Sequence, residues 1–137
     1  MRRPSPTERA GSFSVELIFV LPILLLVVFA LVELSLVLAA ERKLAEVSAV
    51  VARTGSLGGT DAEMTAVMKA AVGPKWADNA ELKLKVSPTD ADDRLQGTTL
   101  EVTVSLPAKY AGPNLLRSIG IDLTEATLVG RTVIVIE

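Results

Sequence analysis

The sequence predicts an α+β protein, in which a long N-terminal transmembrane α-helix precedes a small domain with one helix and a three- or four-stranded antiparallel sheet. Three observations support this prediction. Residues 17–40 are almost continuously apolar, residues 60–72 have the spacing of an amphipathic helix, and three later segments alternate like strands. With 137 residues, the chain has room for one modest domain beside the membrane segment.

The first eleven residues are expected to form a short cytoplasmic leader, because their arginines and prolines make the stretch too polar to pack. The far flank of the apolar run mixes charges of both signs. The positive-inside rule therefore places the N-terminus in the cytoplasm and the C-terminal domain outside. We divide the chain into a leader (1–11), a transmembrane and extended helix (12–54) and an extracytoplasmic α+β domain (60–137).

The segment of residues 17–40 is longer than the about 20 residues that a spanning helix needs. Pro22 removes one backbone hydrogen bond near the helix start, where a kink is tolerated. Glu33 lies about 24 Å beyond Leu17, near the outer edge of the hydrocarbon core. Its carboxylate either reaches towards water or has a functional partner, and the same two interpretations apply to Glu16 at the cytoplasmic edge.

An apolar stripe continues beyond the membrane segment and predicts one helix from about residue 14 to about residue 53, with a glycine-rich exit. The stripe has helical spacing and consists of Val37, Ala40, Leu44, Val47 and Val51. Two uses remain open at this point. The stripe covers the small domain of its own chain, or it packs against neighbouring subunits.

The outer domain is predicted to begin with a second helix, because Thr60 and Glu63 have capping-box spacing and an apolar face follows over residues 64–72. Residues 81–86 and 100–106 alternate between apolar and polar side chains, which is typical of a half-solvated antiparallel sheet. A third strand, residues 127–136, ends in residues 133–136, which are apolar on both faces. We expect it to lie centrally in the sheet or under the helix.

Two loops are candidate binding sites. An acidic loop over residues 89–94 lacks a calcium-binding pattern, because Arg94 and Leu95 lie where a ligand and a glycine are required, so a solvated hairpin loop is preferred. Residues 107–124 are predicted to be a long connection with one helical turn, and long loops often carry binding sites. Trp76 and Tyr110 are expected to belong to the core.

The chain contains neither cysteine nor histidine. Without them the commonest general base, the commonest metal ligand and any thiolate are absent, so no catalytic, cofactor-binding or metal-binding residue and no small-molecule substrate is predicted. The net charge is −2, and the sequence has no basic cluster interleaved with aromatic residues. Nucleic acid is therefore not expected as a partner, and the protein is not expected to be an enzyme.

The segment Gly11-Ser12-Phe13-Ser14-Val15-Glu16 resembles the cleavage site of type IV prepilins. The resemblance implies that a prepilin peptidase cuts between Gly11 and Ser12, which leaves Glu16 as the fifth residue of the mature chain. The wider stretch from Gly11 to Glu33 is similar to the TadE-like family of tight-adherence pilus systems. It departs from the family pattern at residues 12–14 and at Leu17, where small residues and an aromatic residue are usual.

This resemblance implies a minor pilin or pseudopilin that crosses the bacterial inner membrane once and has other pilus subunits as partners. After cleavage, Ser12 would carry a free protonated amine at the membrane edge. Glu16 of another subunit could neutralise this amine, because an unpaired charge in lipid is strongly unfavourable. The alternative is an unprocessed, signal-anchored envelope protein whose outer domain binds a ligand or a partner.

Overall fold

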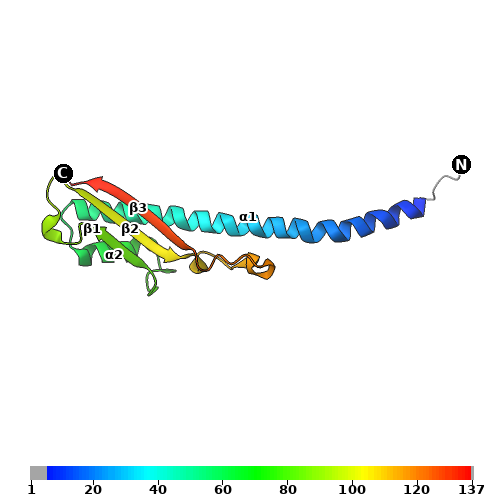
Figure 1. The fold of residues 1–137 in the computed structure, drawn as a ribbon. Helices are drawn as coiled ribbons and strands as arrows, with labels where there is room; N and C mark the ends of the chain where they lie inside the picture. The colour runs from blue at the N-terminus through cyan, green and yellow to red at the C-terminus, as the bar shows by residue number, and fades with distance from the viewer. Residues whose placement is uncertain (1–5, 137) are drawn as a thin grey trace.

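A computed structural model gives the protein an α+β fold with one very long helix that projects from a small domain (Figure 1). The structure describes residues 6–136, but not the side chains of residues 6–15, Ala91 and Ser118. The long helix α1 (Pro6–Ser56) is followed by helix α2 (Asp61–Val72) and strands β1 (Lys83–Ser87), β2 (Thr99–Pro107) and β3 (Thr127–Val135). The predicted fold class is confirmed.

Helix α1 is continuous, as predicted, but it is longer than the sequence pattern indicated at both ends. It begins at Pro6 and passes through Pro22 without interruption. It continues to Ser56, and the chain then leaves through a turn in which the Gly59 N–H donates to the Thr54 carbonyl at 3.0 Å. The predicted glycine-rich exit therefore lies where the helix ends.

The capping box predicted for α2 is confirmed. The Glu63 N–H donates to the Thr60 hydroxyl at 3.3 Å, and the Thr60 N–H donates to the Glu63 carboxylate at 2.8 Å. These bonds satisfy backbone groups that the first turn of a helix leaves without partners. At the other end, Gly73 has a φ of 87°, which ends the helix before Pro74.

The sheet has three antiparallel strands in the order β1-β2-β3 within the described residues. Val102 of β2 pairs with Val86 of β1, and Val104 of β2 pairs with Gly130 of β3. The predicted central position of the third strand is wrong, because β2 lies in the centre and β3 lies at an edge. The alternative, that this strand lies under the helix, is confirmed by the packing of β3 along α1.

Strand β3 has apolar residues on both faces, but only one of these faces is buried. Its inner face packs into the core, whereas Val129, Val133 and Val135 on its outer face are about half exposed. Apolar residues on an edge strand have the same sequence signature as a buried central strand. The sequence pattern could not separate these two positions.

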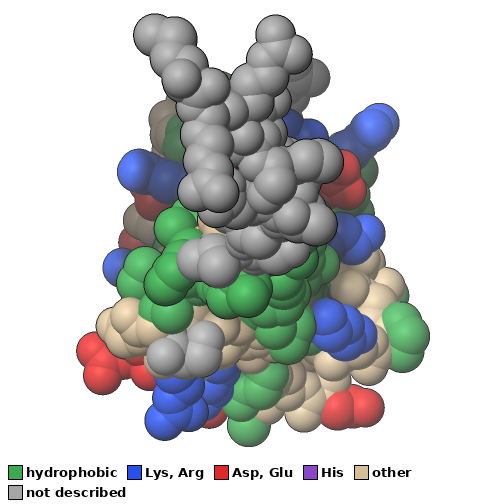
Figure 2. Space-filling model, turned by 90° about the vertical axis from the view of Figure 1, so that its right-hand side faces the viewer, with side chains coloured by type: hydrophobic (Ala, Val, Ile, Leu, Met, Phe, Trp, Pro, Cys, Tyr) green, Lys and Arg blue, Asp and Glu red, His purple; other side chains and the backbone are tan. Residues whose placement is uncertain are grey.

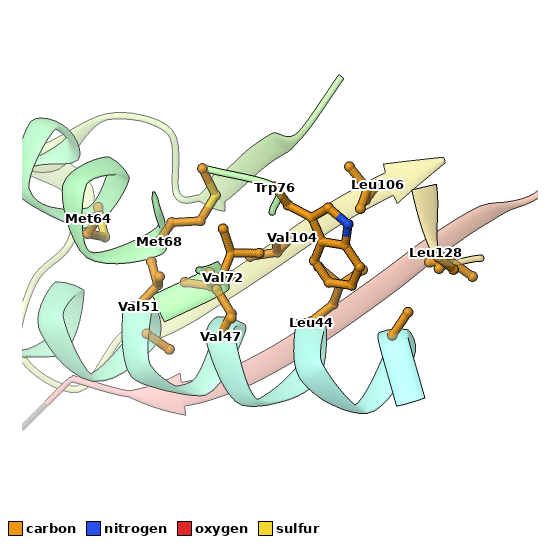
Figure 3. Close-up of a cluster of buried hydrophobic side chains, with 14 of the residues drawn as sticks. Leu44, Val47, Val51, Met64, Met68, Val72, Trp76, Val104, Leu106 and Leu128 are labelled. Carbon is orange, nitrogen blue, oxygen red and sulfur yellow. The ribbon is translucent and has the colours of Figure 1, made fainter. Parts of the chain in front are cut away.

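The hydrophobic core lies between α1, α2 and the inner face of the sheet (Figure 3). The predicted stripe of α1 is part of this core, since Ala40, Leu44, Val47 and Val51 are buried and Val37 packs against them. The stripe therefore covers the domain of its own chain and is not free for neighbouring subunits. Helix α2 contributes the buried residues Met64, Met68 and Val72, as expected from its apolar face.

Strand β3 approaches the backbone of α1 very closely at Gly130. A Cβ atom at this position would overlap the carbonyl group of Leu44 and the backbone nitrogen of Ala45. One turn further along α1, the buried Ser48 hydroxyl lies 2.7 Å from the Thr132 hydroxyl of the same strand. The missing side chain and this hydrogen bond set the distance between the helix and the sheet.

The acidic loop between β1 and β2 is closed by the Arg94 side chain, which is largely buried. Its guanidinium donates to the carbonyls of Pro88 and Thr89, each at 3.2 Å, and its Nη1 lies 2.7 Å from the Asp61 carboxylate of α2. Asp90, Asp92 and Asp93 are exposed. Arg94 therefore holds the loop to α2, and the exposed aspartates agree with the predicted solvated hairpin loop.

Candidate functional site

The most distinctive surface of the molecule is the apolar part of α1 that projects from the domain. Within the described residues, α1 is a helix long and apolar enough to cross a membrane. Most of the large apolar side chains between residues 17 and 34 are exposed. Seen from the N-terminal end of α1, hydrophobic side chains gather along the helix, and charged side chains lie around them (Figure 2). This arrangement suggests a single-pass membrane protein.

The residues of the predicted cleavage site lie at the N-terminal end of this surface. The backbone of Gly11 and Ser12 is part of α1, and their side chains are outside the described part of the chain. Glu16 is exposed, as are the apolar residues that follow it. The structure therefore leaves the Glu16 carboxylate on an open face of the helix, at one end of the candidate membrane span.

Glu33 has a different environment from Glu16. Only 4% of its surface is exposed, and its Oε2 accepts a hydrogen bond of 2.8 Å from the backbone N–H of Leu116. Leu116 lies in a short 3-10 helix, η3 (Leu115–Ile119), in the connection between β2 and β3. The interpretation that Glu33 reaches towards water is wrong, because this connection folds back over the carboxylate.

The connection between β2 and β3 is long and partly helical, as predicted, and it lies against α1. A 3-10 helix, η2 (Ala108–Tyr110), follows β2, and the chain then runs along α1 to η3. Gly112 packs so closely on Leu36 that a Cβ would meet the leucine side chain. A small cavity of about 10 Å³, lined by residues that include Glu33 and Asn114, lies beneath the connection.

The return half of the connection is organised by Asp122. Its Oδ1 accepts hydrogen bonds from the Thr124 hydroxyl, the Thr124 N–H and the Asn114 side-chain amide, at 2.5, 2.9 and 2.9 Å. The hydrogen bonds from Thr124 are the main cause that holds the pKa of Asp122 below its ordinary value, and Asn114 adds to them. The carboxylate therefore ties the two halves of the connection together in its ionised form.

At the start of the connection, Trp76 and Tyr110 belong to the core, as predicted. The Trp76 indole N–H donates to the Tyr110 carbonyl at 3.2 Å. The Tyr110 hydroxyl and the Lys109 ammonium both donate to Glu81, at 3.0 and 2.6 Å. The hydrogen bond from Lys109 is the main cause that lowers the pKa of Glu81, and Tyr110 acts in the same direction.

We expect Glu33→Leu to loosen the connection, whereas Glu33→Gln should retain most of its order, because glutamine still offers an oxygen to the Leu116 N–H. Hydrogen bonds to charged groups contribute about 1.5–3 kcal/mol, so exchange of the Leu116 amide should be about 10- to 100-fold faster in Glu33→Leu. Hydrogen exchange in detergent micelles measures this effect. Glu41→Leu, at an exposed position of the same helix, is the control, and an unchanged Leu116 exchange rate in Glu33→Leu would contradict the assigned role.

The contact between Glu33 and Leu116 joins positions far apart in the sequence, and no local pattern indicates it. The sequence contained one signal, the carboxylate of Glu33 within an apolar run. A partner for this carboxylate was one of the two interpretations of it. Among the described residues, no group of three or more acidic side chains is arranged to hold a metal ion.

Comparison with known families gives one match. Residues 11–53 match the TadE family, described as TadE-like protein. The matched segment contains Glu16, Glu33 and the buried stripe of α1, and it ends just before the exit of the helix. The family is associated with Tad pili and is not known to be enzymatic.

No curated protein and no solved structure matches the chain. The family match therefore concerns α1, and the fold of the domain that follows, residues 60–136, is known from the structure alone. Residues 11–53 are thus similar to the TadE-like family, and this similarity suggests a protein associated with a Tad pilus.

Proposed function

We propose that this chain is a minor pilin or pseudopilin-like membrane protein that acts in the assembly of a tight-adherence, type IV-like pilus or secretion apparatus. The observation that carries the proposal is the TadE match over residues 11–53, which includes the exposed, apolar half of α1 and its prepilin-like start. The proposed location is the bacterial inner membrane, with the N-terminus in the cytoplasm and the C-terminal domain outside.

In the proposed mechanism, a prepilin peptidase removes residues 1–11 and leaves Ser12 with a free, protonated amine. Glu16 of a second subunit neutralises this amine when the two helices meet in the membrane. The exposure of Glu16 supports this role, because its carboxylate remains accessible on an open helix face. The apolar side chains of residues 17–32 are also exposed, so this half of α1 can pack against lipid or against other pilus subunits.

The alternative is an unprocessed, signal-anchored envelope protein with a partner-binding outer domain. One observation favours it, because the peptide bond between Gly11 and Ser12 lies inside α1 and must be unwound before a peptidase can cut it. The glycine lowers this barrier, since glycine in a helix costs about 1 kcal/mol relative to alanine. The two proposals therefore differ in the N-terminus of the mature protein.

The test is N-terminal sequencing of the protein purified from the membranes of a host that has the prepilin peptidase. We expect the mature chain to begin at Ser12. In a Gly11→Leu variant, which lacks the glycine of the cleavage site, residues 1–11 should be retained. The same protein with Glu16→Gln or Glu16→Ala should insert normally but enter the assembly less often, because both variants remove the charge that pairs with the Ser12 amine.

Glu41→Ala is the matched control for assembly, since Glu41 is an exposed carboxylate on the same helix beyond the apolar run. A mature chain that still begins at Met1 would support the anchored alternative, and one that begins at Glu41 would indicate an ordinary secreted protein. Loss of membrane insertion in Glu16→Ala would assign Glu16 to anchoring and not to assembly.

A further inference from the structure

The connection between β2 and β3 is attached to α1 by both of its halves at nearly the same height. Gly112 packs on Leu36, and the Leu116 N–H bonds to Glu33. On the return half, Leu123 and Thr124 line a cavity together with Glu33 and Val37. The segment from the attachment point at Leu116 to Asp122 therefore forms a tip, which we name the 116–122 tip.

The 116–122 tip is compact and points away from the sheet. The Ile121 N–H donates to the Leu116 carbonyl at 3.2 Å, and Gly120, with a φ of 86°, reverses the chain after η3. In Figure 1 this part of the chain, in orange, lies beside α1 and extends further towards the N-terminal end of the helix than the sheet does. The tip is therefore the part of the outer domain nearest to the apolar run.

The thickness of a membrane places the tip at a lipid boundary. About 26 Å of helix separates Glu16 from Glu33 at 1.5 Å per residue, and a hydrocarbon core is about 30 Å thick. If Glu16 marks the cytoplasmic boundary, the opposite boundary falls close to Leu36, where Gly112 packs. The 116–122 tip, attached at Glu33, then begins about 4.5 Å on the lipid side of this outer boundary.

The side chains of the tip match this position. Ile119 and Ile121 are 47% and 48% exposed, and the Arg117 side chain is 74% exposed, with its Nε 3.9 Å from the Asp122 carboxylate of the same tip. Apolar side chains beside an arginine are typical of segments that lie in a membrane interface, where the aliphatic groups enter lipid and the guanidinium meets phosphate groups. We propose that the 116–122 tip inserts into the outer interface of the membrane that α1 crosses, with Ile119 and Ile121 in lipid and Arg117 at the headgroups.

This inference rests on the membrane span of the proposed function, but not on peptidase processing or pilus assembly. The tip gives the outer domain a second attachment to the bilayer beside α1. Two attachments restrict rotation of the domain about the helix axis, so the sheet would face a fixed direction relative to the membrane.

The absence of cysteine from the chain allows a direct test, because a single introduced cysteine carries a single spin label. The full chain with Ile119→Cys or Ile121→Cys is labelled and reconstituted into vesicles of phosphatidylcholine and phosphatidylglycerol. Collision of the label with oxygen, which partitions into lipid, is compared with collision with a water-soluble nickel chelate. Leu24→Cys, in the apolar run, is the lipid control.

The water control is Leu95→Cys, which is 64% exposed and lies in the loop at the opposite end of β2. We expect both tip labels to resemble Leu24→Cys, with nickel collision several-fold lower than at Leu95→Cys and unaffected by a higher lipid-to-protein ratio. Trp76 fluorescence shows that each labelled variant is folded.

Three results would overturn the proposal. Tip labels as accessible to nickel as Leu95→Cys, with Leu24→Cys still in lipid, would refute the insertion and leave the membrane span intact. Nickel access at Leu24→Cys would refute both the span and the insertion. Shielding that disappears at a higher lipid-to-protein ratio would show that a second copy of the chain, and not lipid, covers the tip.

Discussion

Gly130→Ala is expected to destabilise the outer domain by about 3 kcal/mol, at the upper end of the usual range for an overpacked core. The added Cβ would overlap the backbone of α1 at Leu44 and Ala45, which cannot rotate away as a side chain can. Strand β3 must then move away from the helix, and the hydrogen bond between Ser48 and Thr132 must lengthen or break.

Urea unfolding in detergent, followed by the fluorescence of Trp76, measures this effect. Trp76 is the single tryptophan of the chain and is buried in the core. Gly58→Ala is the matched control, because Gly58 has a φ of 83° with no atom near its missing Cβ. This variant should cost about 1 kcal/mol from backbone strain alone. Equal transition midpoints for the two variants would show that β3 does not lie directly against α1.

The sequence was most informative where local chemistry determines the structure. The capping box of Thr60 and Glu63 defined the start of α2, and the alternation in residues 81–86 and 100–106 identified two strands. These signals depend on neighbours within a few residues, so tertiary packing did not alter them.

Position in the sheet depends on tertiary packing, and there the pattern was insufficient. The last residues of the third strand, 133–136, are apolar on both faces, which indicated a central strand, but β3 is an edge strand with exposed valines. The missing signal was Gly130, since a glycine within a strand often marks the close approach of another backbone. Its partner is α1, and a sequence pattern does not reveal which element approaches.

The environment of Glu33 was also beyond local patterns. The same residue type in the same apolar helix is exposed at position 16 and buried at position 33. The difference arises because the connection between β2 and β3 returns to α1 after more than fifty residues of intervening structure. The position of Glu33 along the helix could be calculated from the sequence. The packing of the connection between β2 and β3 over its carboxylate could not.

Helix α1 therefore has two parts with different environments. Residues 17–32 project from the domain with their apolar side chains exposed, whereas the stripe from Val37 to Val51 forms one wall of the core. The TadE match spans both parts. Substitutions in the two parts should consequently have separable effects on stability and on membrane insertion.

Leu44→Ala is expected to destabilise the outer domain by about 2–5 kcal/mol, the range for large-to-small substitutions in well-packed cores. Leu44 is fully buried at the position where β3 crosses α1, so nearby groups can fill little of the space that it leaves. The midpoint of the urea transition, monitored by Trp76 fluorescence in detergent, should fall, while insertion into membranes should be unchanged.

Leu38→Ala removes the same atoms from an exposed position of the same helix, where the side chain is 47% exposed, and should change stability by about 0.5 kcal/mol or less. Leu24→Ala, within the projecting part, should leave the Trp76 transition unchanged. If Leu38→Ala or Leu24→Ala lowered the midpoint as much as Leu44→Ala, the outer domain would depend on the projecting surface of α1. That surface would then not be free for lipid or for other subunits, and the proposed assembly role would lose its structural basis.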